Sequence, residues 1–263
     1  MPDTLGYRYK IAVVVPSTNT SAQPELDRLR LPGVTNHIAR MVINDDSMVR
    51  QPGFDHVMRS IRASTEPAIR GVVTCDPDHV VLAVSPESYW EGPHHHERVL
   101  ASMRETSGGR PVTMSPDAIR AALASHGDIT RVAVITPYLP VGDDSVSRFF
   151  TDAGYDVVRV RGLGCPSPAR IAHVSEDRLR AAVREVDGPD VQAIVQVGTN
   201  VAMARVAAEA EAWLGKPVIA NNVVLYWHAL RSGGIHDAVP GHGELLANHL
   251  TLPQGKVPVL TTS

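Results

Sequence analysis

The chain has 263 residues, 43% of them hydrophobic and 20% charged, which is typical of a folded protein that buries a sizeable core. A formal charge of −3, with no basic run or basic and aromatic alternation, excludes nucleic acid as the expected partner. The apolar stretch before Pro16 is too short for a signal sequence or a membrane span, which predicts a cytoplasmic protein with no membrane partner.

Short β-branched runs alternate along the chain with longer segments of helical periodicity, a pattern typical of parallel strands joined by crossover helices. The expected strands, in chain order, are residues 9–15, 37–42, 79–84, 131–136, 156–159, 193–197 and 217–220. The expected helices are residues 54–70, 97–106, 116–125, 143–153, 176–185, 202–214 and 223–232.

The two halves share an arrangement, because the runs at 11–19 and 132–140 both read as a strand, a proline and a polar loop that enters a helix. This predicts an α/β protein with two pseudo-symmetric open parallel-sheet α/β domains and the active site between them. We place the domains at residues 1–115 and 116–224. A variant in which the segment 225–263 closes the first domain stays open.

Ligands of open parallel sheets bind beyond the carboxyl ends of the strands, so the loops after the strands are the candidate site. The first loop holds Ser17, Thr18 and Asn19, which suit an anion such as a carboxylate or, alternatively, form a plain helix N-cap. The loops after the later strands contribute further polar groups, at Ser85, Tyr138, Gly198, Thr199 and Asn200. Tyr138 is either a hydrogen-bond donor to a carboxylate or an interface tyrosine.

Three segments resemble motifs of maleate isomerases in the same order: PSTNTSAQPELDRL at 16–29, TPYLPVGDDSVSRFFTDAGYDVV at 136–158, and GTNVAMARVAAEAEAWLGKPVIANNVVLYWHALRSGGI at 198–235. The resemblance runs from about residue 9 to residue 236. It is specific to the aspartate/glutamate racemase superfamily, closest to the maleate cis-trans isomerase and arylmalonate decarboxylase group. It implies two α/β domains with the substrate between them, no metal or organic cofactor, and a homodimer or homotetramer.

The resemblance also implies that both catalytic cysteines of the family are replaced, because their positions correspond to Val84 and Gly198. A family asparagine corresponds to Ser167 or Pro168. Asn19, Tyr138 and Asn200, in contrast, match the carboxylate-binding side of the family. The binding residues are therefore expected to be kept while the chemistry of two thiols is not.

Other groups could take over the proton transfer. Glu87 or His94, in the loop after the third expected strand, is a candidate general base. Cys165 follows a strand on the side of the ligand loops and is a candidate catalytic thiol, or a half-buried apolar residue, whereas Cys75 is expected at the opposite end. The triplet 94–96 cannot converge on one metal ion, since consecutive helical positions point about 100° apart, and we expect no metal.

The leading hypothesis is a cofactor-independent enzyme that hydrolyses, hydrates or decarboxylates a small carboxylate or carbonyl compound, with cyclic amides and lactones included as substrates. One alternative is a maleate isomerase or racemase that uses Cys165 or other displaced groups. A second alternative is a catalytically inactive carboxylate-binding protein.

Overall fold

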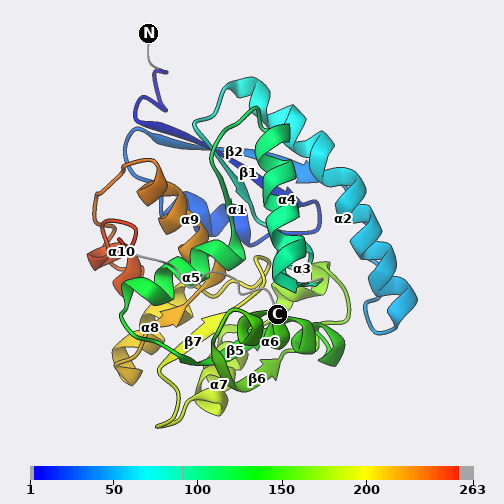
Figure 1. The fold of residues 1–263 in the computed structure, drawn as a ribbon, viewed down its shortest axis with the longest axis vertical. Coiled ribbons are helices and arrows are strands. Elements are labelled where there is room, and N and C mark those ends of the chain that lie inside the picture. The colour runs from blue at the N-terminus through cyan, green and yellow to red at the C-terminus, as the bar shows by residue number, and fades with distance from the viewer. Residues whose placement is uncertain (1–2, 91, 255–263) are drawn as a thin grey trace.

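The structure is a computed structural model that describes residues 3–90 and 92–254, and these residues form two four-stranded parallel sheets. The first sheet has the order β2-β1-β3-β4, with β1 at Tyr9–Pro16, β2 at Val34–Met41, β3 at His79–Leu82 and β4 at Val112–Met114. The second has the order β6-β5-β7-β8, with β5 at Arg131–Thr136, β6 at Asp156–Gly162, β7 at Ala193–Gln196 and β8 at Val218–Ile219. The identical order confirms the predicted duplicated α/β architecture (Figure 1).

The central strands are apolar without alternation because helices cover both faces of each sheet. Every residue from Ile11 to Val15 is fully buried in β1, as is every residue from Val132 to Ile135 in β5. Both faces of these strands therefore belong to the core.

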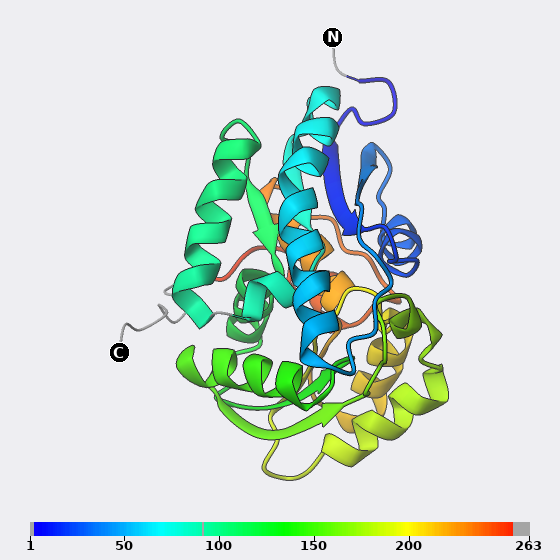
Figure 2. The same cartoon turned by 90° about the vertical axis from the view of Figure 1, so that its right-hand side faces the viewer.

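Helices from distant parts of the chain cover the first sheet. On one side lie α2 (Gln51–Val72) and α4 (Gly92–Thr106), as Figure 2 shows for α2. On the other side α9 (Asn221–Ser232) packs on β3 and β4 and is flanked by α1 (Ala22–Arg28) and α5 (Ser115–Ser125). Since α9 follows β8, the chain returns from the second sheet to the first.

The second sheet is covered by α6 (Pro140–Asp152) on one side and by α7 (Glu176–Val186) and α8 (Ala204–Leu214) on the other. Between the halves, α6 meets α4 and the short helix α3 (Pro86–Tyr89). Tyr89 packs edge-on against Phe149 there, with ring centroids 5.0 Å apart, and both side chains are buried. This aromatic contact joins the two halves beside the candidate site.

Sequence periodicity locates the long elements and misses the short ones. All expected strands form with bounds within three residues, and the seven expected helices form, α4 beginning five residues early. The short elements α3, β4 and α10 (Glu244–Asn248) were not expected, nor were the 3-10 helices Val73–Cys75 and Ala169–His173, because each is too short to show a period. A helix was expected to follow the first loop, where α1 lies, but without bounds. The expected domain boundary assigns α5 to the second domain. In the structure α5 packs on β4, a strand of the first sheet, and on α9, which covers that sheet. The boundary itself stays a prediction.

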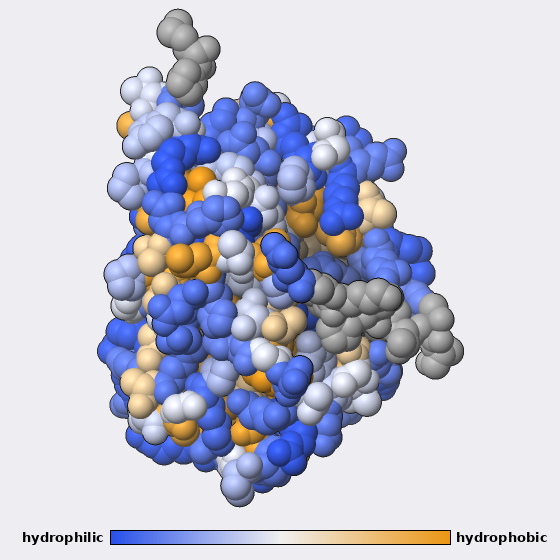
Figure 3. Space-filling view, turned by 60° about the vertical axis from the view of Figure 1, so that its left-hand side comes forward, coloured by the Kyte–Doolittle hydropathy of each residue, from blue (hydrophilic) through white to orange (hydrophobic). Residues whose placement is uncertain are grey.

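One face of the molecule, shown in Figure 3, is mostly hydrophilic with small scattered apolar areas. In the part of the chain that the structure describes, no helix is both long enough and apolar enough to cross a membrane.

Candidate functional site

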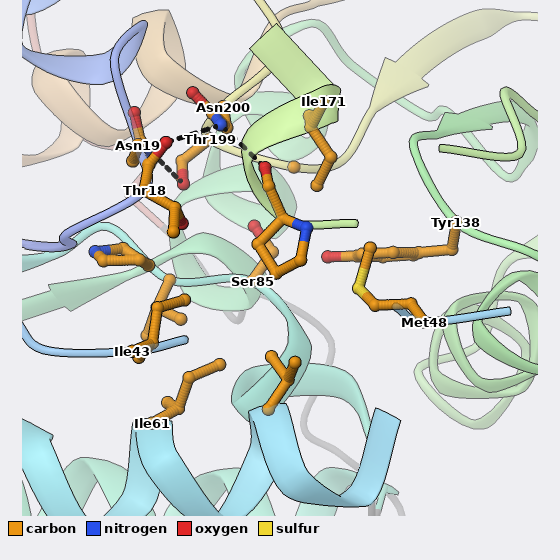
Figure 4. Close-up of a pocket in the computed structure, with 15 residues that line it drawn as sticks. Thr18, Asn19, Ile43, Met48, Ile61, Ser85, Tyr138, Ile171, Thr199 and Asn200 are labelled. Carbon is orange, nitrogen blue, oxygen red and sulfur yellow. Dashed lines mark hydrogen bonds between the residues drawn. The ribbon is translucent and has the colours of Figure 1, made fainter. Parts of the chain in front are cut away.

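The loops that follow β1, β3, β5 and β7 meet between the two sheets and enclose a cavity, the inner cavity, with about 50 Å³ of free space (Figure 4). All predicted binding residues except Ser17 line it: Thr18, Asn19, Ser85, Tyr138, Gly198, Thr199 and Asn200. Val84, at the expected first thiol position, lines it as well. The loops that were predicted from the strand ends therefore meet at one cavity, and their role as a binding site stays a prediction.

Ser17 has a structural contact instead. Its hydroxyl donates to the Ile43 carbonyl at 3.2 Å and accepts from the Ile43 N–H at 3.1 Å. These two bonds tie the loop after β1 to the segment after β2. Ser17 thus holds Ile43, which does line the inner cavity, in place.

Asn19 and Thr199 connect the two halves across the cavity. The Asn19 amide donates to the Thr199 hydroxyl at 3.0 Å, and this hydroxyl donates to the Ala83 carbonyl at 2.9 Å. The Asn19 side-chain oxygen accepts the backbone N–H groups of Ser21, the N-cap residue of α1, and of Ala22, the first residue of that helix. One side chain thus binds the start of α1 and lines the inner cavity.

Asn200 uses its whole side-chain amide within the protein. It donates to the carbonyls of Thr18 and Pro168 at 3.3 and 3.0 Å and accepts from the N–H groups of Thr20 and Ser21 at 2.9 and 3.3 Å. An amide has two donor hydrogens, so none remains for a ligand. Asn200 therefore positions the loops through its side chain, and any contact with a ligand is left to its backbone.

Backbone N–H groups supply the free donors at the cavity. Within the described part of the chain, the N–H groups of Ser85, Thr199 and Asn200 have no hydrogen-bond acceptor. These residues line the inner cavity, on loops that leave β3 and β7. Backbone N–H groups without a protein acceptor, on residues that line a cavity, are candidate donors to a carboxylate or an enolate oxygen.

Glu25, from α1, forms a second link between the halves. Its carboxylate accepts the Ala204 N–H at 2.9 Å, at the start of α8, and the Asn222 side-chain amide at 2.7 Å. Only 7% of Glu25 is exposed, and this burial raises its pKa, although the two hydrogen bonds act in the opposite direction. Glu25 lies behind the loops and does not line the inner cavity.

Tyr138 points its hydroxyl into the middle of the inner cavity (Figure 4). Burial raises the pKa of Tyr138 well above its ordinary range, and the neighbouring Ser85 side chain offsets this only in part. The hydroxyl therefore stays protonated at neutral pH and can donate a hydrogen bond or a proton. Among the described side chains that line the cavity it is the one ionisable group.

The Tyr138 loop is fixed by the residues around it. The Thr136 hydroxyl accepts the Tyr138 N–H at 3.0 Å and donates to the Asp143 carboxylate. Gly142 packs on Tyr138 so closely that an added Cβ would lie 2.6 Å from the Tyr138 Cβ. Burial raises the pKa of Asp143 to about 6. Asp143 and Gly142 are thus positioning residues for Tyr138.

Gly198 begins the β7 loop in a conformation that favours glycine. Its φ is +107°, and a Cβ at this position would lie 2.7 Å from Pro137 Cγ. The turn places Thr199 and Asn200 at the inner cavity, and their N–H groups have no acceptor among the described residues. Backbone donors therefore occupy the place where the resemblance expects a thiol.

The remaining walls of the inner cavity are apolar, and we did not expect them from the sequence. Ile43 and Met48 come from the segment after β2, Val57 and Ile61 from α2, and Ile171 from the second half. In Figure 4 Ile43 and Ile61 lie across the cavity from Asn200. The four-residue spacing of Val57 and Ile61 places both on one face of α2, which is the signal that could have identified this wall.

Of the other catalytic candidates, Cys165 and His94 do not line the inner cavity. Cys165 is 3% exposed, and burial raises the pKa of its thiol, which disfavours the reactive thiolate. His94 is exposed on α4, with its ring nitrogen 4.0 Å from Glu97. The backbone of Glu87 belongs to α3, but its side chain lies outside the described residues. Cys75 is exposed before β3, at the far end of that strand, as expected.

Two further histidines, His96 and His228, make structural contacts. His96, two residues after His94, is fully buried, and its Nε2 lies 2.8 Å from Asp117 on α5. His228 was expected to pack, and its ring contacts Thr113 at 2.8 Å. Among the residues that the structure describes, no three His, Cys, Asp or Glu side chains are arranged to hold a metal ion.

The arylmalonate decarboxylase family matches residues 11–246, nearly the whole chain. The chain belongs to this family. A maleate isomerase of Nocardia farcinica is 26% identical over 251 residues, covering 92% of this chain and 96% of that protein. An arylmalonate decarboxylase of Bordetella bronchiseptica is 27% identical over 161 residues, covering 60% of this chain and 66% of that protein.

The fold agrees with this membership. The solved structure of the Nocardia farcinica maleate cis-trans isomerase bound to TRIS has a TM-score of 0.83 at 24% identity, covering 92% of this chain and 98% of that one. The family thus includes relatives with two different reactions, an isomerisation and a decarboxylation, and membership does not choose between them.

Proposed function

We propose that the chain is a cofactor-independent enzyme that removes a carboxylate from a small acid bearing an apolar substituent, as in a substituted malonate. The observation that carries this proposal is the inner cavity, in which hydrogen-bond donors face apolar walls. Maleate and a substituted malonate would each place one of their two charges against those walls, which is unfavourable. A malonate can keep one carboxylate at the donors and lose the other as uncharged carbon dioxide.

The chemical step is balanced by groups at the cavity. The bond between the α-carbon and the departing carboxylate breaks, and its electron pair moves into the retained carboxylate as an enediolate. The N–H groups of Ser85, Thr199 and Asn200 stabilise the oxygen charge that develops. The Tyr138 hydroxyl gives its proton to the α-carbon and regains one from water.

The proposal is tested by incubating the purified protein with phenylmalonate, methylmalonate and maleate and measuring carbon dioxide and the acids formed. We expect phenylmalonate to yield phenylacetate and carbon dioxide, with maleate left unchanged. Tyr138→Phe should lower kcat by about 10² to 10⁴, the usual contribution of a proton donor. Conversion of maleate to fumarate, without turnover of either malonate, would overturn the proposal.

Two variants separate this reaction from the other chemistries that the sequence leaves open. Cys165→Ser should leave decarboxylation unchanged, whereas it would eliminate turnover in an isomerase that uses this thiol. Glu87→Gln should also leave the rate unchanged, whereas it would abolish hydrolysis or hydration by a general base. Lactones and cyclic amides, added as substrates, complete that comparison.

A carboxylate-binding protein without turnover is the second candidate. The observation in its favour is that no thiol, carboxylate or imidazole is found among the described side chains lining the inner cavity. Calorimetric binding of phenylacetate, with no product from any malonate, would support it over the enzyme.

The cytoplasmic location stays a prediction, which fractionation of cells would test. The homodimer or homotetramer also stays a prediction, which light scattering would test.

A further inference from the structure

A second cavity, the outer cavity, adjoins the first and has about 230 Å³ of free space. Its walls are Met48 and Val49, Phe54 at the start of α2, and the segment 138–142. Met48 and Tyr138 line both cavities. In Figure 4 these two side chains lie against each other at one edge of the inner cavity. Met48 therefore lies at the partition between the two spaces.

The backbone around Met48 is fixed to the second half of the molecule. The Met48 N–H donates to the Pro166 carbonyl at 2.7 Å, and the Asp45 carboxylate accepts the Ala169 N–H at 2.8 Å. The side chain is 8% exposed, unbranched and rich in rotamers. It can move aside without any displacement of the loop that carries it.

The outer cavity suits an apolar group. Phe54 forms one wall and stacks on Trp90 with ring centroids 4.0 Å apart. Val49 and Val141 line it as well and are 60% and 54% exposed, so the cavity opens to solvent past apolar side chains. An aromatic or branched aliphatic group loses water contact there and gains contacts on several sides.

We propose that the outer cavity is a subsite for the far end of an apolar substituent whose carboxylate is held in the inner cavity, and that Met48 determines how large this substituent can be. The inference deepens the proposed function, on which it rests for the class of ligand. Small substituents stay within the inner cavity. Larger ones extend past Met48 into the outer cavity and contact Phe54.

Binding of product-like acids tests the subsite without any need for turnover. Phenylacetate and 2-naphthylacetate are titrated into the wild type and Met48→Ala by calorimetry. We expect Met48→Ala to increase the affinity for naphthylacetate by at least ~10-fold, since its second ring gains the apolar space that Met48 fills, and to change phenylacetate by less than ~3-fold. Met103→Ala is the matched control, because Met103 is also 8% exposed and lines neither cavity.

A second variant connects the gain to the outer cavity. Val141→Trp, added to Met48→Ala, fills the outer cavity from its exposed rim and should cancel the gain for naphthylacetate. An unchanged naphthylacetate affinity in Met48→Ala, an equal gain in Met103→Ala, or a gain that persists in the double variant would each overturn the inference. Failure of the proposed reaction is separate: it would appear as absent decarboxylation while the Met48→Ala gain in binding remains.

Discussion

Gly198 occupies the position at which the resemblance places the second family thiol, and its backbone conformation disfavours any side chain there. Its φ of +107° and the 2.7 Å approach of a Cβ to Pro137 both penalise any other residue. We predict that Gly198→Cys lowers the free energy of unfolding by about 2 to 4 kcal/mol, from backbone strain and overpacking together. Urea unfolding at neutral pH measures this difference.

Gly215 supplies the control for Gly198, because its φ is also positive, at +63°, while no atom lies within 4 Å of an added Cβ. Gly215→Ala should therefore show the cost of the backbone alone, and Gly198→Ala should exceed it by about 1 to 3 kcal/mol. Equal losses in the two alanine variants would show that Pro137 yields to a side chain, and a thiol at 198 would then be tolerated.

The residues at the ends of the strands could be predicted, but the roles of their side chains could not. Position after a parallel strand is a local property, so Thr18, Ser85 and Thr199 were identified from the sequence alone. Which atoms of Asn200 remain free depends on partners more than thirty residues away, such as Pro168, and no local pattern reports these. Met48 could not be predicted either, because it is apolar and does not directly follow the end of a strand.

At the scale of elements, α1 illustrates how a segment of seven residues can join two domains. Glu25 on α1 pairs with the first N–H of α8 and with Asn222 on α9. We predict that Glu25→Ala lowers the free energy of unfolding by about 2 to 4 kcal/mol, because two buried donors lose their acceptor. Asp27→Ala, on the exposed face of the same helix, should change it by less than about 1 kcal/mol in the same urea titration. Similar losses in the two variants would contradict a joining role for Glu25.

The sequence predicts a helix after the first loop but could not give the bounds of α1, because its length gives fewer than two full turns and its Pro24 reads as a helix breaker. Proline is accepted there because it lies in the first turn, where the N–H groups have no partner within the helix. Similarly, β4 has three residues, and its pairing with β3 depends on the fold of the whole sheet. Long elements with many periods, such as α2, do not depend on this context.

At the scale of the whole molecule, a buried row of polar side chains crosses the first sheet and ends on α9. His79 contacts the Tyr9 hydroxyl at 3.1 Å and the Thr113 hydroxyl at 2.7 Å, and Thr113 contacts His228 at 2.8 Å. Burial, with the nearby His228, lowers the pKa of His79 to about 3. Burial lowers the pKa of His228 to about 4, against the influence of Asp117. Both rings are therefore neutral in the folded protein at neutral pH.

These two histidines predict that the fold loses stability in mild acid. As the pH falls from about 6.5 to about 4, the unfolded chain binds protons at His79 and His228 while the folded chain does not. The free energy of unfolding should then decrease by about 1.4 kcal/mol per pH unit for each histidine. His228→Asn, which keeps a polar group toward Thr113, should reduce this slope by the contribution of one histidine. Urea titrations between pH 7 and 5 measure the slope. His173→Asn, at an exposed position, should leave the slope unchanged, and an unaltered slope in His228→Asn would show that other groups cause the acid sensitivity.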